Sequence, residues 1–570
     1  MFHFELTRFA IAGMQATIAR PIHRRSLLFT MCPGRKYRKT IIGRCAWRLL
    51  LLLIFGLAGG DAFAADAAAV RPVGGALVVG TASEPGHLNP AITTAGNVHA
   101  VTASLFNGLV GLDQNAEPVP ELAERWQVSR DGKTITLFLR NDVRWHDGTP
   151  FTSADVKFTF EELLLKFHAR TRAGLQEALA EITAPEAHIV RFRFNQPYAP
   201  FLRRLDVIEA PILPRHIYQG KDPFSGAANN RPVGTGPFRF GSWTRGNNIA
   251  LTRNEGYFRK GRPYLERLTF RFLPTTAAAV VALEVGEVDY MWSVEGADLN
   301  HLRGAKKLVL ERSAAGSGGS YCINTLIPNL RKLPLQRPEV RRASNFAIDR
   351  KFSLERVNFG AGKAARGPIH SSLPWFDPAL PAFSLDRQAA GRLLDGAGYP
   401  PAANGVRFSL RFAYAHAGFG PLADALKLQL AQVGIDLALE PGDFNAVAER
   451  VFVKNDFDLG VASYCNGADP DIGVKRVYHS KNIVPIPFSN GAAYRNPEVD
   501  ALFGRAVQSF DPAERVVLYR EIQNILVADV PYFWLIETEG HRAFRSQISG
   551  LRIWSGNAFE DAYIDATPRQ

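Results

Sequence analysis

The sequence predicts an α/β protein built from two lobes. At 570 residues, the chain is too long for one hydrophobic core, because single cores stop growing at about 250–300 residues. Stretches with the two-residue period of strands alternate with helical stretches in both halves of the chain. This alternation indicates two α/β lobes side by side, and ligands in such architectures bind between lobes, beyond the ends of strands.

In the first half, the ends of two helices can be predicted from single residues. Thr152 followed by Asp155 resembles a capping box, so a helix begins there. Thr275 or Thr276 caps a second helix, and Gly286 ends it. Alternating or continuous apolar residues predict strands at residues 76–80, 135–139, 268–272 and 288–292.

The sequence PVGTGP at residues 232–237 predicts a rigid corner. Pro232 and Pro237 fix φ near −65°, while Gly234 and Gly236 can take positive φ. After the corner, apolar and other residues alternate on both sides of a turn between residues 238 and 251, which is typical of a hairpin. We therefore expect the corner to deliver a hairpin to a fixed place.

The second half of the chain repeats the alternation. Strands are expected at residues 321–324, 407–414, 436–442 and 458–464. Helices are expected at residues 338–349, 384–394 and 422–433. Two late helices begin at Asn496-Pro497 and Asp511-Pro512, where a capping side chain precedes a proline.

The N-terminal residues 1–64 have the features of a secretory signal peptide. A basic region precedes the apolar residues 49–58, which are too few to span a bilayer, and Ala-Phe-Ala at 62–64 is a small-residue cleavage site. Met31 is an alternative start, and an uncleaved anchor is the alternative interpretation. No cysteine lies near residues 57–60. We therefore expect an unlipidated periplasmic protein that begins at Ala65.

Removing this segment changes the charge balance. Residues 1–64 hold ten basic and two acidic residues, so +8 of the formal net charge of +13 is lost and +5 remains. The remaining basic residues are mixed with acidic ones, which argues against nucleic-acid binding. Cys322 and Cys465 are the cysteines left after cleavage, and we expect two free, mostly buried thiols rather than a disulfide.

Catalytic and metal-binding patterns are absent from the sequence. It contains no G-x-S-x-G, H-E-x-x-H, C-x-x-C or phosphate-loop motif, and the serines of residues 316–320 are out of register for a nucleophile elbow. Asp469-Pro470-Asp471 is more typical of a turn at a strand end than of an acid–base pair. His87 and His146 lie in turns without a partner at metal-ligand spacing, so we expect them to be solvated. No catalytic residue, metal ion or cofactor is predicted.

Four aromatic residues lie at strand ends or in neighbouring loops: Trp292, Trp375, Tyr464 and Phe488. Each one alone is more typical of core packing. Together, at a cleft between lobes, they would form stacking or hydrophobic walls for a small solute.

Several stretches carry a resemblance to a known family. The most specific is LAERWQVSRDGKTITLFLRNDVRWHDGTPFTSADVKFTFE, residues 122–161, followed in order by PVGTGPF, NEGYF, RPEVRRASNFAIDR, LLDGAGYP and ADPD. This ordered set, which covers nearly the whole mature chain, resembles the extracellular solute-binding proteins of ABC importers in the peptide/nickel/opine class, solute-binding family 5.

The resemblance implies a two-lobed flytrap with a small extra domain inserted in the first lobe. Residues 65–110, 230–312 and 528–570 would form lobe I, residues 111–229 the inserted domain, and residues 313–527 lobe II. The corner at 232–237 would then return the chain to lobe I near the ligand cleft. A solute would bridge the lobes, and the closed monomer would dock on an inner-membrane permease with cytoplasmic ATPase subunits.

The sequence departs from the family pattern at the ligand site. In the family's peptide binders an aspartate before the DPD turn pairs with the peptide amine, whereas the nearest counterpart here is Asn466 in a shortened loop. An amide supplies no opposite charge, which favours a polar, hydroxyl- or amide-bearing solute over one whose main charged group is a free ammonium. Peptides, opines and related amino-acid or sugar conjugates stay open as solutes. The candidate ligand-binding residues are Trp292, Asn324, Trp375, Tyr464, Cys465, Asn466 and Asp469.

Two other functions stay open at this point. A secreted hydrolase on the same scaffold would turn its ligand over. A periplasmic sensor would bind a solute without transporting it.

Overall fold

The structure is a computed structural model that describes residues 73–294, 296–312, 321–552 and 557–565. The predicted signal peptide, Met31, the predicted mature start at Ala65 and residues 316–320 lie outside the described residues.

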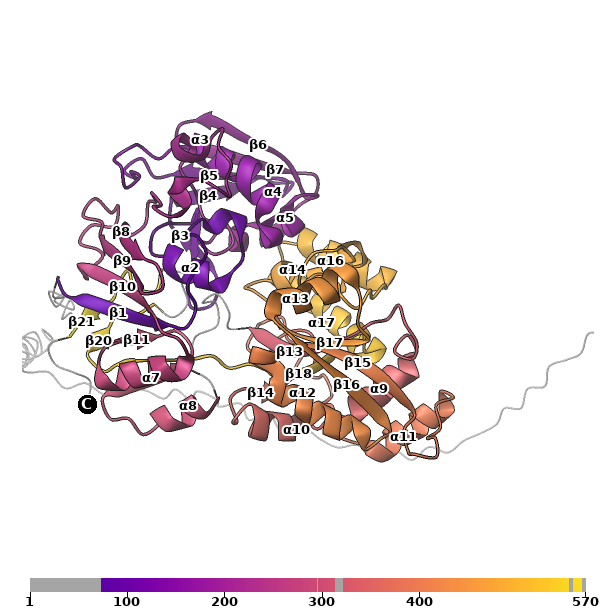
Figure 1. The fold of residues 1–570 in the computed structure, drawn as a ribbon. Coiled ribbons are helices and arrows are strands. Elements are labelled where there is room, and N and C mark those ends of the chain that lie inside the picture. Colours follow the sequence, from indigo (N-terminus) through magenta and orange to yellow (C-terminus); the bar gives the residue numbers. More distant parts are fainter. Residues whose placement is uncertain (1–72, 295, 313–320, 553–556, 566–570) are drawn as a thin grey trace, which may run out of the picture. The chain divides into compact units, whose positions relative to one another are not determined.

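The first lobe is built on a mixed sheet whose order along its width is β12-β19-β11-β1-β10-β9-β8 in the described part of the chain. Figure 1 labels β8, β9, β10, β1 and β11 of this sheet. Strands β10 and β11 both run parallel to β1, while β8 and β9 form the predicted hairpin. The bounds are β1 (Ala76–Thr81), β8 (Phe238–Thr244), β9 (Asn248–Arg253), β10 (Arg267–Phe272), β11 (Tyr290–Met291), β12 (Leu308–Arg312) and β19 (His541–Arg545).

Helix α7 (Thr276–Val285) links β10 to β11. Its ends agree with the sequence, because the Thr275 side chain accepts a hydrogen bond from the Ala278 amide and Gly286 is left-handed at φ 82°. Buried residues of α7 pack with α8 (Gly296–Leu302) and β11 in a small apolar cluster.

The two glycines of the corner before β8 are explained by the close approach of the corner to the backbone of Leu105. An added Cβ on Gly234 would lie 1.8 Å from the Leu105 carbonyl oxygen, and one on Gly236 would lie 2.5 Å from the Leu105 carbonyl carbon. Neither glycine has positive φ, so the expected reason for these glycines was wrong. No side chain fits where the corner passes so close to another part of the backbone.

His146 also holds this corner. Its ring Nδ1 lies 3.1 Å from the Gly234 amide and its Nε2 lies 3.0 Å from the Gly236 carbonyl. The amide donates to Nδ1, so Nε2–H donates to the carbonyl and the ring is neutral. Burial lowers the pKa of His146 to about 4. The expectation that His146 is solvated was therefore wrong, because the HDGTP turn packs on the corner.

The chain between β1 and β8 in sequence forms a separate antiparallel sheet, whose order in the described residues is β4-β5-β7-β6. Alternate residues of β5 are buried, as the sequence predicts, and Thr152 and Asp155 form the predicted capping box at the start of α3. The bounds are β4 (Ala123–Val128), β5 (Thr134–Leu139), β6 (Leu179–Glu186), β7 (Ile189–Phe194), α3 (Ser153–Phe158), η2 (Thr159–Leu164), α4 (Leu165–Phe167) and α5 (Ala169–Leu175). We use the name inserted domain for the predicted residues 111–229, whose boundaries stay a prediction.

The second lobe is built on another mixed sheet, of order β14-β18-β13-β17-β15-β16 within the described ranges. The strands are β13 (Cys322–Pro328), β14 (Lys363–Ala364), β15 (Phe408–Ala415), β16 (Ile435–Gly442), β17 (Leu459–Cys465) and β18 (Phe533–Glu537). The helices are α9 (Pro338–Phe346), α10 (Arg350–Phe352), α11 (Arg387–Gly396), α12 (His416–Ala431), α13 (Phe444–Ala448), α14 (Pro470–Gly473), α15 (Lys475–Tyr478), α16 (Pro497–Gln508) and α17 (Pro512–Asp529).

Strand β18 corrects one predicted boundary. We expected lobe I to resume at residue 528, but β18 pairs with β13 in the second sheet. The chain returns to the first sheet only at β19, which pairs with β11 and β12. Residues 533–536 of β18 are apolar and all of β18 is buried, as expected of a strand that is covered on both faces.

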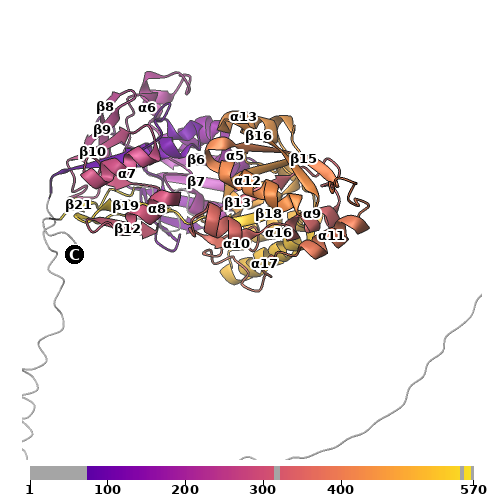
Figure 2. The same cartoon turned by 60° about the horizontal axis from the view of Figure 1, so that its bottom comes forward.

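Helices cover both faces of this second sheet. Leu459 and Val461 of β17 pack in one apolar cluster with α12, and Ala462 and Tyr464 pack in another with α17. Figure 2 shows α12 on one side of the sheet and α17 on the other. The alternation follows from the two-residue period of a strand.

The remaining described elements are short. They are α2 (Gly96–Thr102), α6 (Arg215–Tyr218), β2 (Val110–Leu112), β3 (Pro118–Pro120), β20 (Ile548–Ser549), β21 (Tyr563–Ile564), η1 (Pro90–Ile92), η3 (Ala199–Arg204), η4 (Ala227–Asn229), η5 (Ser353–Val357), η6 (Glu449–Lys454) and η7 (Ser480–Asn482).

Candidate functional site

The candidate site lies at the edge of the second sheet where three parallel strands end. Strand β15 runs parallel to both β16 and β17, so the carboxyl ends of all three meet at the same edge. Strand β17 ends at Cys465, and the chain continues through Asn466 into α14 and α15. This is the edge at which α/β proteins place their ligands.

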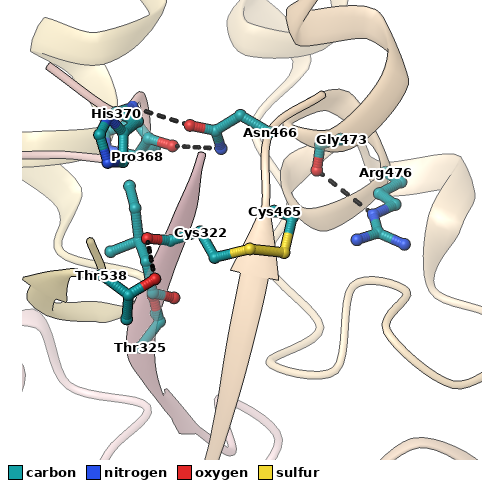
Figure 3. Close-up of a disulfide and its surroundings, with 10 residues drawn as sticks. Cys322, Thr325, Pro368, His370, Cys465, Asn466, Gly473, Arg476 and Thr538 are labelled. Carbon is teal, nitrogen blue, oxygen red and sulfur yellow. Dashed lines mark hydrogen bonds between the residues drawn. A yellow bond between two sulfur atoms is a disulfide. The ribbon is translucent and has the colours of Figure 1, made fainter. Parts of the chain in front are cut away.

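Cys322 and Cys465 form a disulfide between β13 and β17 (Figure 3). The expectation of two free thiols was wrong. The two cysteines are 143 residues apart in sequence, but the antiparallel register of the strands places them directly opposite each other. The Cys322 carbonyl also accepts hydrogen bonds from the amide and the hydroxyl of Thr538, just beyond β18.

Asn466 is buried and holds a neighbouring loop. Its Oδ1 accepts a hydrogen bond from the His370 amide at 2.7 Å, and its Nδ2 donates to the Pro368 carbonyl at 3.1 Å (Figure 3). Both ends of the side-chain amide are therefore occupied by protein backbone. In this arrangement Asn466 positions residues 368–370, and direct contact with a solute stays a prediction.

Asp469 and Asp471 are both buried and neutralised by cations. Asp469 caps α14 and forms a 2.7 Å ion pair with Arg515. Asp471 pairs with Arg204 at 2.8 Å and with Lys475 at 2.9 Å. Neither carboxylate therefore carries an uncompensated charge for a cationic solute.

Tyr464 and Asn466 line one small hollow. Its other lining residues come from β13, the loop at 368, α14, α15 and β18: Ile323, Thr325, Pro368, Gly473, Val474, Val477, Tyr478 and Trp534. The hollow therefore belongs to the second lobe. The Tyr464 ring packs edge-on against Phe488 and Tyr532.

The other candidate residues are distributed more widely. Trp375 is buried, with the Arg515 guanidinium over its ring and Tyr519 at its edge, so the structure places it in the core of the second lobe. Asn324 is half-buried in β13, opposite Ser463 of β17. Trp292 follows β11 of the first lobe and packs against Tyr290 and Phe559. Their contact with a solute stays a prediction.

The buried cluster around Asp471 was missed by sequence reasoning. Arg204 donates to both the side chain and the backbone carbonyl of Asp471, and the Tyr198 hydroxyl donates to the same carboxylate. Tyr198 and Arg204 belong to the inserted domain, so this cluster joins that domain to the second lobe. The paired aspartates of the ADPD stretch were the visible signal, but nothing in the sequence points to Arg204 as their partner.

The described residues show neither a metal site nor a membrane-spanning helix. They contain no group of three or more His, Cys, Asp or Glu side chains placed to hold a metal ion. None of the helices in the described ranges has the length and apolarity that a bilayer-spanning helix needs.

Comparison with known proteins decides the family. The family model described as bacterial extracellular solute-binding proteins, family 5 Middle, matches residues 117–484. The chain belongs to this family. The resemblance inferred from the sequence is thereby confirmed.

Two relatives match most of the chain. Protein XP55 of Streptomyces lividans is 30% identical over 485 residues, which cover 83% of this chain and 86% of the relative. The probable D,D-dipeptide-binding periplasmic protein DdpA of Escherichia coli K12 is 28% identical, over 83% of this chain and 91% of its own.

Solved structures confirm the two-lobed fold of this solute-binding protein. DppA of Helicobacter pylori, an ABC transporter-associated periplasmic binding protein in complex with the peptide STSA, has a TM-score of 0.76 and 25% identity, over 87% of this chain and 99% of its own. AgaA of A. tumefaciens R10, in complex with agropinic acid, has a TM-score of 0.75 and 26% identity, over 86% of this chain and 99% of its own. DdpA, DppA and AgaA are binding proteins by name.

Proposed function

We propose that this solute-binding protein captures a small polar solute between its two lobes and delivers it to an ABC permease. The observation that carries the proposal is the family membership together with the placement of the candidate site at the carboxyl edge of the second sheet. The chain passes between the sheets twice, from β12 to β13 and from β18 to β19. In this proposal the described crossing from β18 to β19 serves as a hinge about which the lobes close on a ligand.

The solute is opine-like or another amino-acid conjugate rather than an ordinary peptide. Asn466 replaces the aspartate that resemblance to peptide binders would lead us to expect, and its amide is bonded to backbone. Asp469 and Asp471 are each paired with an arginine. Neither of these two carboxylates is thus free to pair with an ammonium group of a solute. We expect weak binding of di- and tripeptides, because losing a charge-assisted hydrogen bond costs roughly 1.5–3 kcal/mol, about ten- to a hundredfold in affinity.

The protein acts as a binder and leaves its ligand unchanged. It is exported by the predicted signal peptide, is cleaved before Ala65, carries no lipid and is a monomer in the periplasm. Intact-mass measurement and light scattering of protein from the periplasmic fraction test these points. A mass that requires residues before Ala65 or an acyl chain contradicts them, as does a dimer.

Mass spectrometry of small molecules that co-purify with the natively expressed protein tests the function. We expect a polar solute of low molecular mass, and small-angle scattering of stripped protein should show contraction when that solute is added back. The solute should be recovered intact. A cleaved product would indicate a hydrolase, and binding without contraction would contradict capture between the lobes.

A further inference from the structure

Arg170, Arg204 and Arg476 meet where the inserted domain contacts the second lobe. Arg476 differs from the other two because it has no carboxylate partner among the described residues. Arg204 pairs with Asp471 at 2.8 Å, and Arg170 pairs with Glu209 at 3.1 Å. Arg476, in α15, has no carboxylate within 4.0 Å among the described residues, and its Nε donates to the Gly473 carbonyl at 3.3 Å. The remaining guanidinium nitrogens of Arg476 thus have no protein anion beside them in the described chain.

The surroundings make an unpaired guanidinium unfavourable. Burial and the nearby cations of Arg170 and Arg204 lower the pKa of Arg476 to about 10, although Tyr464 and Glu209 act in the opposite direction. The side chain nevertheless keeps partial exposure to solvent. A cation that is largely desolvated and yet reachable from outside is stabilised best by an anion that binds there.

The charges of the cluster also favour an anion. The cations Arg170, Arg204, Lys475 and Arg476 face the carboxylates Glu209 and Asp471. Asp206 lies beside Glu209, but burial and that neighbour raise the pKa of Asp206 to about 7, so it is only partly charged at neutral pH. Burial also keeps His99 and His168 neutral, because it lowers their pKa values. The cluster therefore carries a net positive charge.

Arg476 is placed firmly at the candidate site. Gly473 packs so tightly on the end of β17 that an added Cβ would lie 2.1 Å from the Cys465 carbonyl oxygen. The hydrogen bond to Gly473 therefore ties Arg476 to Cys465 and Asn466. Figure 3 shows Arg476 beside the end of β17, with its terminal nitrogens turned away from the Gly473 carbonyl. Gly473 and Val477, the residue after Arg476, both line the hollow.

We propose that Arg476 binds an anionic group of the solute, a carboxylate, through the terminal nitrogens of its guanidinium. The inference rests on the proposed function and names the chemistry of its ligand. A planar guanidinium matches a carboxylate with two parallel hydrogen bonds, which gives orientation as well as affinity. Asn466 is bonded to backbone, and Asp469 and Asp471 are neutralised by cations. The carboxylate of the solute is therefore the charged group through which the solute binds here. An acidic conjugate fits this site better than a cationic one.

The test compares Arg476→Gln and Arg476→Lys with Arg520→Gln, which removes the same charge from an exposed position of α17. Each protein is purified natively, and its bound small molecules are released and quantified. We expect the wild type and Arg520→Gln to carry a solute with a carboxylate. Arg476→Gln should bind that solute ten- to a hundredfold more weakly in calorimetry, and Arg476→Lys should restore part of the affinity. Melting curves check that each variant is folded.

The outcomes separate this inference from the proposed function. Equal affinity of wild type and Arg476→Gln for the solute, or a solute without an anionic group, overturns the inference and leaves the proposed function standing. Methyl esterification of the carboxylate should weaken binding to the wild type but not to Arg476→Gln, and equal losses in both overturn the inference as well. A wild type that carries no solute and does not bind agropinic acid overturns both.

Discussion

Arg204 and Asp471 lie 267 residues apart in the sequence and form a buried ion pair across the contact between the inserted domain and the second lobe. Their nearest charged atoms are 2.8 Å apart, and their side chains are 1% and 0% exposed. Burial alone would raise the pKa of Asp471, but the charges of Lys475 and Arg204 and the hydrogen bond from Tyr198 hold it well below its usual range. The carboxylate is thus the common partner of three groups.

Replacing Asp471 by asparagine should destabilise the protein strongly. Asp471→Asn leaves Arg204 buried without its counter-charge, and breaking such a pair costs about 3–5 kcal/mol. Denaturant titration followed by intrinsic fluorescence measures the loss. Asp142→Asn is the control, because its pair with Arg140 is solvent-exposed and such pairs contribute about 0–1 kcal/mol. Equal effects of the two substitutions would contradict the assignment.

Buried histidines should make the stability fall as the pH falls from 6.5 towards 4. Burial lowers the pKa of His99 and of His370 from 6.5 to about 4. The unfolded chain binds protons at these sites before the folded protein does, so the stabilisation is complete above pH 6.5 and is lost as the pH falls through this window. Each histidine contributes up to about 3 kcal/mol.

The measurement is the difference between wild type and His99→Gln in thermal melts from pH 7.5 to 4.5. This comparison is needed because Glu537 and Asp206 have raised pKa values and act in the opposite direction. Glutamine can keep the hydrogen bond that the His99 ring makes to the Thr93 carbonyl, but it has no proton to gain. We expect a flatter pH profile for the variant. Parallel profiles would show that His99 does not titrate on unfolding.

Local signals in the sequence explain which elements could be predicted. Strand β5 and helix α7 were found because a two-residue period and a Thr275 to Gly286 pair of caps are local features. Helix α12 begins at His416, six residues before the predicted start, and carries Pro421 inside it. Two glycines and this proline in the first turns hide the helical pattern, and tertiary packing overrides their low propensity.

The site was less predictable because its contacts are long-range. The end of β17 was placed correctly at the edge of a sheet, since a buried strand followed by ADPD marks it. The Cys322–Cys465 disulfide depends on the register of two strands that are far apart in sequence. The Arg204–Asp471 pair depends on how the inserted domain meets the second lobe. Neither the disulfide nor the ion pair can be predicted from a local pattern in a single sequence.

Asn466→Ala should weaken both folding and solute binding. The His370 amide and the Pro368 carbonyl would each lose a buried partner, at a cost of about 1–3 kcal/mol per group. The freed residues 368–370 lie beside the candidate site, so affinity for the co-purifying solute should fall as well. Melting curves and calorimetry measure the two effects. Asn300→Ala, at an exposed position of α8, is the control. Normal stability of Asn466→Ala would show that these hydrogen bonds are not formed.

The disulfide should be present in the exported protein and should stabilise it. Cys322 and Cys465 face each other across β13 and β17, and the bond closes a loop with a sequence separation of 143. Disulfides form in the periplasm and contribute about 2–4 kcal/mol, mainly by restricting the unfolded chain. Protein from the periplasmic fraction should show no reactive thiol when it is unfolded without reductant and two thiols when it is unfolded with reductant. Reductant should lower the melting temperature of the wild type and leave a Cys322→Ser, Cys465→Ser double variant unchanged. Two reactive thiols without reductant would show that the cysteines stay free.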